Sequence, residues 1–285
     1  MCRLTINRIL EMDSTFTNIV PVLACCLYEL NQQNKLYRLS HSLSEKFPNE
    51  ASTWFCVGIY YLSLGKIAEA RCVFSKASLM SPHFGPAWIG FAHSFAMEGE
   101  HDQAISAYTT AARLFEGSHL PSLFLGMQHM ELGNIVLAEE FYNSAYRLNK
   151  SDPLLLNELG VVAYAKGRYA DAVTFCKSAL KLVDEGESEP SAWVSVWINL
   201  GHSHRKLKKY RIALEYFEEA AIISANNARI ATSKGLCYLY LEDYYNAIFE
   251  FHQVRFKTHY MFELLMNLTT IYKGSIFESC RHGRI

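Results

Sequence analysis

A pattern of small and large residues that recurs every 34 positions constrains the fold of this chain more than any other feature. In residues 51–84, places 8 and 20 of the repeat hold the small residues Gly58 and Ala70, and places 4 and 24 hold the large residues Trp54 and Phe74. The same alternation returns in the next unit along the chain. A period of this length predicts repeated supersecondary units rather than a globular domain with a single core.

The register divides most of the chain into consecutive repeats. Strong copies occupy 51–84, 85–118, 119–152, 153–186 and 194–227, and weaker copies occupy 17–50 and 228–261. Residues 187–193 interrupt the register, and we expect an exposed loop between repeats there. The remaining parts are expected to be a remnant helix of a preceding repeat (1–16), the first helix of an incomplete repeat (262–272) and a tail without repeat character (273–285).

A hairpin of two helices explains the pattern. Small residues are needed where the helices approach closely, and large residues fill the space between those contacts. Glycine recurs at the expected turn inside four of the hairpins (Gly65, Gly99, Gly133 and Gly167), where it can end the first helix. The period and residue types are typical of tetratricopeptide repeats (TPRs), so we predict an all-α, right-handed α-solenoid of about seven repeats. The alternative, a chance alignment in an ordinary helical bundle, is disfavoured by four strong repeats in unbroken register.

Charge and composition favour protein partners. Lys and Arg number 27 against 28 Asp and Glu, so no excess of positive charge indicates nucleic acid or an anionic membrane. Hydrophobic residues make up 50% of the chain and charged residues 19%, which is apolar for an elongated fold. We therefore expect part of the surface to contact other chains, and we expect the isolated chain to self-associate through the apolar ends of the repeat array.

The eight cysteines do not form a disulfide framework, because they are scattered and no C-x-x-C pair occurs. The chain has no basic-then-apolar leader and no run of 18 apolar residues. An intracellular, reducing compartment with free thiols is the expectation. The adjacent Cys25 and Cys26 could be redox-active, but buried cysteines that pack as small apolar residues are the favoured interpretation.

The register also predicts an inner, concave face. Places 2, 5, 9 and 12 of each first helix lie on one side of that helix. The side chains expected to line a partner-binding groove there are Phe55, Ile59, Ile89, His93, Leu123, Met127, Asn157, Val161, Tyr164, Ile198, His202 and Arg205. The alternative is that some of these mostly apolar side chains pack against the next repeat.

Polar groups converge near the C-terminal part of this face. Arg205 is predicted to bind a partner's carboxylate or backbone carbonyl, although a basic run such as 205–211 can also be a solvated helix end. His202 and His204 are two residues apart and point to different sides of a helix, which disfavours a metal site. Because His204 occupies a packing place, we interpret it as a core histidine.

Motifs for catalysis are absent from the sequence. No G-x-S-x-G, H-E-x-x-H, phosphate-binding glycine loop or dinucleotide fingerprint occurs, so neither an enzyme nor a cofactor is expected. A TPR-bearing enzyme would need an additional catalytic domain, and the repeats leave no residues for one.

Several stretches resemble one family beyond the generic repeat. They are Ser52–Gly58, Gly85–Gly90, His93–Ala96, Glu100–Gln103, Gly117–Pro121, Glu158–Val162, Asn199–His202 and Arg205–Tyr210. In this order and spacing the chain resembles the cell-division-cycle protein sixteen family, which is subunit six of the anaphase-promoting complex. The resemblance runs from about Leu30 to about Phe251.

The resemblance implies a non-catalytic scaffold of a ubiquitin ligase that controls mitosis and cell division, in nucleus and cytoplasm. The implied partners are other subunits of that complex, including a small extended one of the cell-division-cycle protein twenty-six type held in the groove. Family members form homodimers through N-terminal repeats. Because Met1 falls inside the second helix of an earlier repeat, those repeats are expected to be missing and homodimerisation stays open.

A free-standing adaptor or co-chaperone that binds extended peptides is the rival function. An adaptor that binds the C-terminus of a peptide would need Lys, Arg and Asn side chains clustered on adjacent groove helices. The first three strong repeats carry Phe, Ile, Leu and Met there instead, which favours the scaffold.

Overall fold

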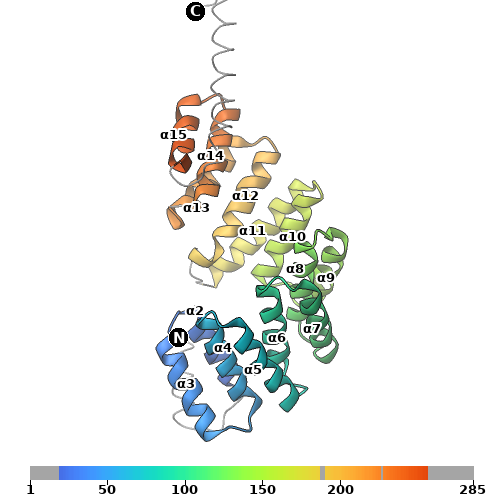
Figure 1. Cartoon of the computed structure of the whole chain (residues 1–285). Helices are drawn as coiled ribbons and strands as arrows, with labels where there is room; N and C mark the ends of the chain where they lie inside the picture. The colour runs from blue at the N-terminus through green and yellow to red at the C-terminus, as the bar shows by residue number, and fades with distance from the viewer. Residues whose placement is uncertain (1–18, 187–189, 226, 256–285) are drawn as a thin grey trace, which may run out of the picture. The chain divides into compact units, whose positions relative to one another are not determined.

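The computed structural model describes residues 19–186, 190–225 and 227–255 (Figure 1). These residues form fourteen α-helices and one short 3-10 helix, with no strand among them. The predicted all-α class is confirmed. The chain divides into two compact units, Met1–Lys150 and Ser151–Ile285.

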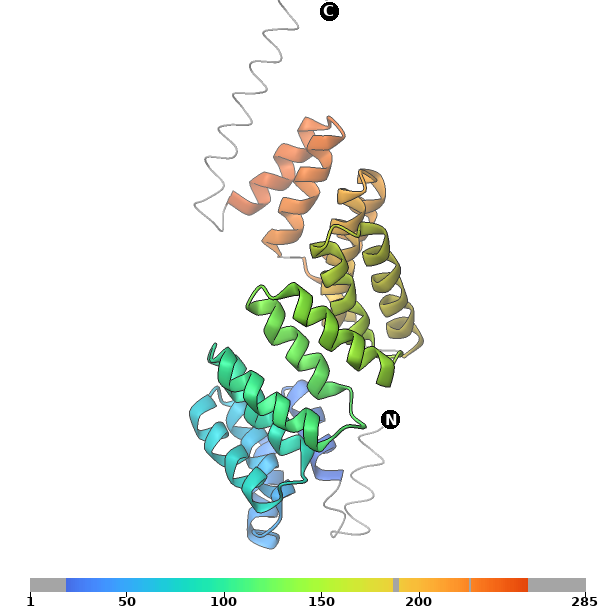
Figure 2. The same ribbon diagram turned by 90° about the vertical axis from the view of Figure 1, so that its right-hand side faces the viewer.

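The first unit contains eight described helices that pair as consecutive hairpins, which Figure 2 shows from the side. They are α2 (Val20–Glu29), α3 (Gln33–Lys46), α4 (Ala51–Ser63), α5 (Ile67–Met80), α6 (Gly85–Met97), α7 (His101–Leu114), α8 (Leu120–Glu131) and α9 (Ile135–Leu148). Each of the segments 17–50, 51–84, 85–118 and 119–152 therefore holds one pair of helices.

The second unit continues the pattern. Its described helices are α10 (Pro153–Ala165), α11 (Tyr169–Glu185), α12 (Val194–Lys206), α13 (Tyr210–Ile223), α14 (Ala228–Tyr240) and α15 (Tyr244–Arg255). In the interruption after α11, Pro190–Trp193 form the 3-10 helix η2, and the side chains of Pro190, Ser191 and Ala192 are exposed. Residues 187–189 and the segments 1–16, 262–272 and 273–285, for which we made predictions, lie outside the described residues.

The small residues at place 8 let the two helices of a hairpin approach closely. A Cβ atom added at Gly126 on α8 would lie 2.4 Å from Cε1 of Tyr142 on α9. One added at Gly201 on α12 would lie 2.5 Å from Cε1 of Phe217 on α13. Both rings are fully buried, so they have little room to move away. The alternation of small and large residues follows from this shared space.

The turn inside each hairpin needs left-handed backbone. Gly65, Gly99, Gly133 and Gly167 have φ angles of 73°, 76°, 76° and 77°. The equivalent residue of the other hairpins is not glycine, yet Asn31, Lys208 and Glu242 also have positive φ, at 51°, 60° and 61°. Glycine adopts this conformation without the steric penalty that a Cβ atom adds, which accounts for the glycines in the sequence pattern.

Two tryptophans join successive hairpins in the first unit. Nε1 of Trp54 on α4 donates a hydrogen bond to the carbonyl oxygen of Pro48, at 2.8 Å. Nε1 of Trp88 on α6 donates to the carbonyl oxygen of Pro82, at 3.0 Å. The proline that ends one repeat and the tryptophan that begins the next therefore form one joint.

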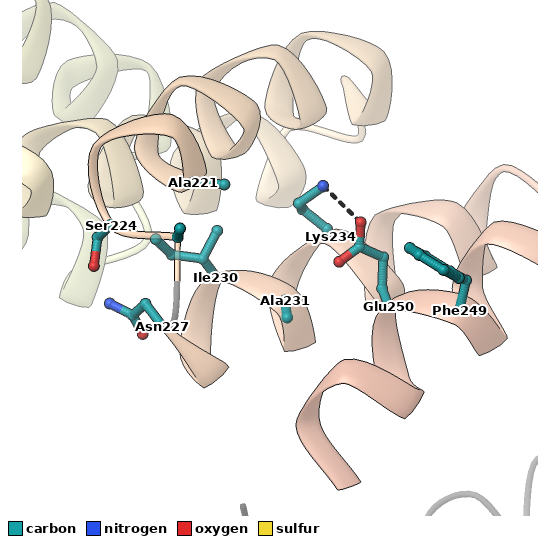
Figure 3. Close-up of a pocket in the computed structure, with 9 residues that line it drawn as sticks. Ala221, Ser224, Asn227, Ile230, Ala231, Lys234, Phe249 and Glu250 are labelled. Carbon is teal, nitrogen blue, oxygen red and sulfur yellow. Dashed lines mark ion pairs between the residues drawn. The ribbon is translucent and has the colours of Figure 1, made fainter. Parts of the chain in front are cut away.

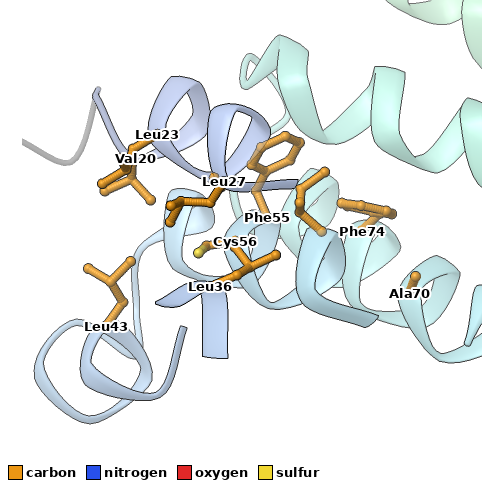
Figure 4. Close-up of a cluster of buried hydrophobic side chains, with 11 residues drawn as sticks. Val20, Leu23, Leu27, Leu36, Leu43, Phe55, Cys56, Ala70 and Phe74 are labelled. Carbon is orange, nitrogen blue, oxygen red and sulfur yellow. The ribbon is translucent and has the colours of Figure 1, made fainter. Parts of the chain in front are cut away.

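The core at the start of the first unit is built from α2 to α5 (Figure 4). Val20, Leu23 and Leu27 of α2 join the buried side chains of the next two hairpin helices and of Phe74 on α5. The weak repeat 17–50 thus contributes a packed apolar face despite its poor match to the pattern. None of the described helices combines the length and apolarity that crossing a bilayer requires.

Candidate functional site

The predicted inner-face residues do not share one environment. The place-5 side chains of Phe55, Leu123 and Asn157 are 3%, 0% and 4% exposed, and Ile59 is also buried. The partly exposed members of the set are Ile89, His93, Met127, Val161, Tyr164, Ile198, His202 and Arg205.

The assignment of Phe55, Leu123 and Asn157 to an open groove is therefore corrected, because these side chains lie in the packing of the array. The ring centroid of Phe55 lies 5.7 Å from that of Phe74 and 5.9 Å from that of Phe84. Phe74 and Phe84 belong to the same repeat as Phe55, whereas Asn157 packs against the next repeat, as the alternative interpretation of this face proposed.

Asn157 links two first helices of the second unit. Its side-chain Oδ1 accepts a hydrogen bond of 2.9 Å from Nδ2 of Asn199 on α12. Its Nδ2 donates to Oε1 of Glu158, at 3.1 Å. A buried amide must be hydrogen-bonded to be tolerated, and here the neighbouring repeat supplies the partner. Asn157 thus holds α10 to α12.

A cleft of about 620 Å³ lies along the first helices of the first unit. Three of the predicted residues, Ile59, His93 and Met127, line it, together with Leu62 and Ala96 at place 12 of the same face. The lining residues that we did not predict are Cys25, Tyr28, Glu29, Met97, His101, Tyr108, Phe124, Gln128 and Glu131. Cys25 and Tyr28 occupy places 9 and 12 of the weak repeat 17–50, so the same register would have found them had it been applied there.

An aromatic cluster forms one part of this cleft. The imidazole of His93 packs edge-on against Phe124 with ring centroids 4.5 Å apart, and Phe124 stacks on Tyr108 at 5.6 Å. Nδ1 of His93 is hydrogen-bonded to the hydroxyl of Tyr108. Burial lowers the pKa of His93 to about 4, so its imidazole is neutral at physiological pH. The cluster presents an apolar, uncharged surface.

Carboxylates supply the formal charge of the cleft. Glu29 and Glu131 are both exposed, and no lysine or arginine lies among the lining residues. Cys25 is exposed and Cys26 is half-buried, so the interpretation of both as buried packing residues is wrong. The surrounding protein still desolvates the Cys25 thiol, and this desolvation, followed by the nearby Cys26 and Glu29, raises its pKa to about 11. Cys25 is therefore a protonated thiol at neutral pH and a poor nucleophile. The cleft combines apolar surface with two negative groups.

The inner face of the second unit has a different chemistry. His202 and Arg205 lie on the same side of α12, and the apolar Ile198 lies one turn before His202 on that side. His204 is buried on α12 and its ring stacks on Tyr216 with centroids 5.3 Å apart, so the prediction of a core histidine is confirmed. No group of three metal-ligating side chains occurs among the described residues.

A smaller cavity of about 240 Å³ lies between α13, α14 and α15 (Figure 3). Nζ of Lys234 on α14 and Oε1 of Glu250 on α15 form an ion pair of 2.6 Å at its wall. Both side chains are mostly buried, so the pair neutralises two charges that would otherwise be costly there. Phe249 lies beside them and its side chain is exposed.

Models of the tetratricopeptide-repeat family match residues 89–153 and 151–223. A bacterial protein, Pseudomonas aeruginosa pilF, shares the fold with a TM-score of 0.62 at 20% identity, over 72% of this chain and 90% of that one. At that level of identity the likeness concerns the fold alone.

Higher identity is found to one group of curated proteins. The anaphase-promoting complex subunit cut9 of Schizosaccharomyces pombe is 53% identical over 82% of this chain and 35% of its own length. Anaphase-promoting complex subunit CDC16 of Saccharomyces cerevisiae is 44% identical over 87% of this chain and 29% of its own. The human cell division cycle protein 16 homolog is 38% identical over 88% of this chain and 41% of its own. The chain thus spans about a third of the length of the relatives it matches.

A solved structure gives the same result. The Cut9 chain in the crystal structure of the Cut9–Hcn1 hetero-tetramer matches with a TM-score of 0.82 and 51% identity. The match covers 87% of this chain and 48% of that one. Over more than four-fifths of its length this chain is therefore a tetratricopeptide-repeat protein of the Cut9/CDC16 type.

Proposed function

We propose that this chain is a non-catalytic scaffold of an anaphase-promoting complex and that it holds an extended segment of another subunit in the cleft of its first unit. Support comes from the likeness to cut9 and CDC16, both named as subunits of that complex. Cut9 was crystallised with Hcn1, which makes an Hcn1-type subunit the first candidate partner. We propose nuclear and cytoplasmic locations on the same grounds.

The cleft is the observation that carries the proposal. Its volume of about 620 Å³ suits a few side chains of an extended peptide rather than a folded domain. Ile59, Met97 and Met127 offer apolar contacts, and the unbranched methionines can adapt to different side chains. Glu29 and Glu131 add negative charge without a cation among the lining residues. A segment with apolar side chains next to Lys or Arg is complementary to this surface.

The titratable groups in the cleft are suited to binding rather than to chemistry. The raised pKa of Cys25 leaves its thiol protonated, and the lowered pKa of His93 leaves its imidazole neutral and hydrogen-bonded to Tyr108. A nucleophile would need the thiolate and a base able to generate it. This arrangement supports a scaffold role.

Co-expression with an Hcn1-type subunit followed by affinity purification tests the proposal. In the chain with Met127→Glu, a carboxylate enters a partly buried apolar wall beside Glu131, so recovery of the partner should fall about tenfold or more. Met80→Glu is the matched control, since Met80 is exposed on α5 outside the cleft, and it should leave recovery unchanged.

Charge reversal tests the electrostatic part separately. Glu131→Lys should weaken retention of the partner more at low salt than at high salt, because the attraction is screened. Glu69→Lys, on the exposed side of α5, makes the same change of charge outside the cleft. If the unmodified chain recovers no partner, or if the cleft and control variants behave alike, the proposed site is wrong.

A further inference from the structure

The inner face of the second unit carries cations where the cleft of the first unit carries carboxylates. His202 and Arg205 are three residues apart on α12, so they lie on one side of that helix. Arg229 lies in the first turn of α14, and α12 and α14 are in contact. We refer to His202, Arg205 and Arg229 together as the cationic cluster.

The cationic cluster has no anionic partner within the described residues. Nε of Arg205 and Nδ1 of His202 are buried and make no hydrogen bond. Among α10, α12 and α14 the one carboxylate is Glu158, which already accepts a hydrogen bond from Asn157. Lys234 shows the contrast, since its ammonium group is paired with Glu250 at 2.6 Å. The cation pairing found elsewhere in this unit is missing here.

The positive charges of Arg205 and Arg229 both act on the imidazole of His202. Burial first, and then the positive charges of Arg205 and Arg229, lower the pKa of His202 to about 4. Both guanidinium groups are therefore close enough to influence the same imidazole, and no nearby anion offsets them. At neutral pH that imidazole is uncharged and can donate one N–H. Two guanidinium groups and one N–H donor thus lie near one another, and none of them is paired with an acceptor among the described residues.

We propose that His202, Arg205 and Arg229 bind the carboxylate of an Asp or Glu side chain in the extended segment of a partner. The site rests on the proposed scaffold function and adds an acidic residue to what the partner must present. Arg205 is half-buried and Arg229 is exposed, so a partner's carboxylate can reach both guanidinium groups from solvent. The planar fork of Arg matches the two oxygens of a carboxylate, and the His202 N–H can provide a further bond.

Surface plasmon resonance with the full chain immobilised at low density tests this site. The probes are short, capped peptide pools that are identical except at one fixed central position, which is Asp, Asn or phosphoserine. The flanking positions are drawn from Leu, Ile, Ala, Ser and Arg, so every pool can also enter the apolar cleft. We expect the Asp pool to bind about tenfold more tightly than the Asn pool, and the difference to shrink with added salt.

The variants locate the effect. Arg205→Gln with Arg229→Gln should abolish the preference for Asp over Asn while leaving the affinity for the Asn pool unchanged. Lys206→Gln is the matched control, because Lys206 is the exposed neighbour of Arg205 and removes the same charge, and it should retain the preference. Thermal melts by circular dichroism confirm that each variant is folded.

Each contrary result has a distinct meaning. Equal binding of the Asp and Asn pools, or a preference that survives the double substitution, overturns the anion site and leaves the scaffold function intact. A stronger preference for phosphoserine than for Asp would make the ligand a phosphopeptide and overturn the assignment to Asp or Glu. Loss of the preference in Lys206→Gln would reduce the effect to general charge. Failure of every pool to bind counts against the scaffold function as well.

Discussion

Replacing Gly201 by alanine tests the packing that defines the helical hairpins. The added Cβ would lie 2.5 Å, 2.7 Å and 2.8 Å from Cε1, Cζ and Cδ1 of Phe217. Favourable carbon–carbon contacts are about 3.5–4.0 Å, so three ring atoms would each overlap the methyl group by about 1 Å. Phe217 is fully buried and cannot swing into solvent. The strain must be relieved by moving α12 away from α13.

Two opposing effects set the change in the free energy of unfolding caused by Gly201→Ala. Overpacking a well-filled core typically costs about 1–3 kcal/mol, and the contact with three atoms of a buried ring places this substitution at the upper end. Alanine in a helix interior is favoured over glycine by about 1 kcal/mol, which offsets part of the strain. We therefore expect Gly201→Ala to lower the free energy of unfolding by about 1–2 kcal/mol.

Urea denaturation followed by circular dichroism measures the effect, with two companion variants. Gly117→Ala is the control, since a Cβ there has no atom within 4 Å, and it should be neutral or slightly stabilising. Adding Phe217→Leu to Gly201→Ala opens space for the methyl group, so the double variant should be more stable than the sum of the single effects predicts. If Gly201→Ala is as well tolerated as Gly117→Ala, the explanation of the small residues by close helix approach is wrong.

Three further predictions follow from the described residues. Gly167→Ala should destabilise the chain by about 1 kcal/mol, because Gly167 has a φ of 77°. Lys208→Gly at the equivalent turn should stabilise the chain, and thermal melts measure both effects. The pKa of His93 is about 4 in the folded chain against 6.5 in the unfolded chain, so the free energy of unfolding should fall as the pH drops from 6.5 towards 4. Urea titrations at several pH values should show a weaker pH dependence for His93→Gln. Tyr245 and Phe249 on α15 are 81% and 56% exposed, so Tyr245→Lys with Phe249→Lys should reduce self-association measured by light scattering, and an unchanged mass would contradict this.

Sequence periodicity predicted the fold well because the repeat pattern reflects the side-chain volume that each place between the helices can hold. A place that must be Gly or Ala in every hairpin is visible without structural information, and Gly126, Gly160 and Gly201 all lie against a side chain of the paired helix. The turn was predicted for a related reason, since glycine marks positive φ at four of the seven turns. Where Lys208 replaces glycine, only the register identifies the same backbone conformation.

The candidate site was less predictable because the period gives the side of a helix but not what covers it. Asn157 was assigned to the groove as a polar group, yet Asn199 of the next first helix covers it and satisfies its amide. No periodic rule distinguishes an open inner-face position from one closed by a neighbouring helix. Tyr108, on the second helix of its hairpin, was missed because it reaches the cleft through its length, by way of its hydrogen bond with His93.

Under the proposed function, the arrangement would let one fold hold chemically different partner segments. Packing uses the small residues and the large residue of each hairpin, and those places vary little along the chain. Places 9 and 12 are mostly half-exposed, so they can hold Met127 in one repeat and His202 with Arg205 in another. A substitution there changes surface charge without opening a cavity, and surface changes of this kind alter stability by only a few tenths of a kcal/mol. Glu29 and Glu131 in the first unit and Arg205 and Arg229 in the second also lie outside that packing, so substitutions there would change the proposed partner specificity while the hairpins stay intact.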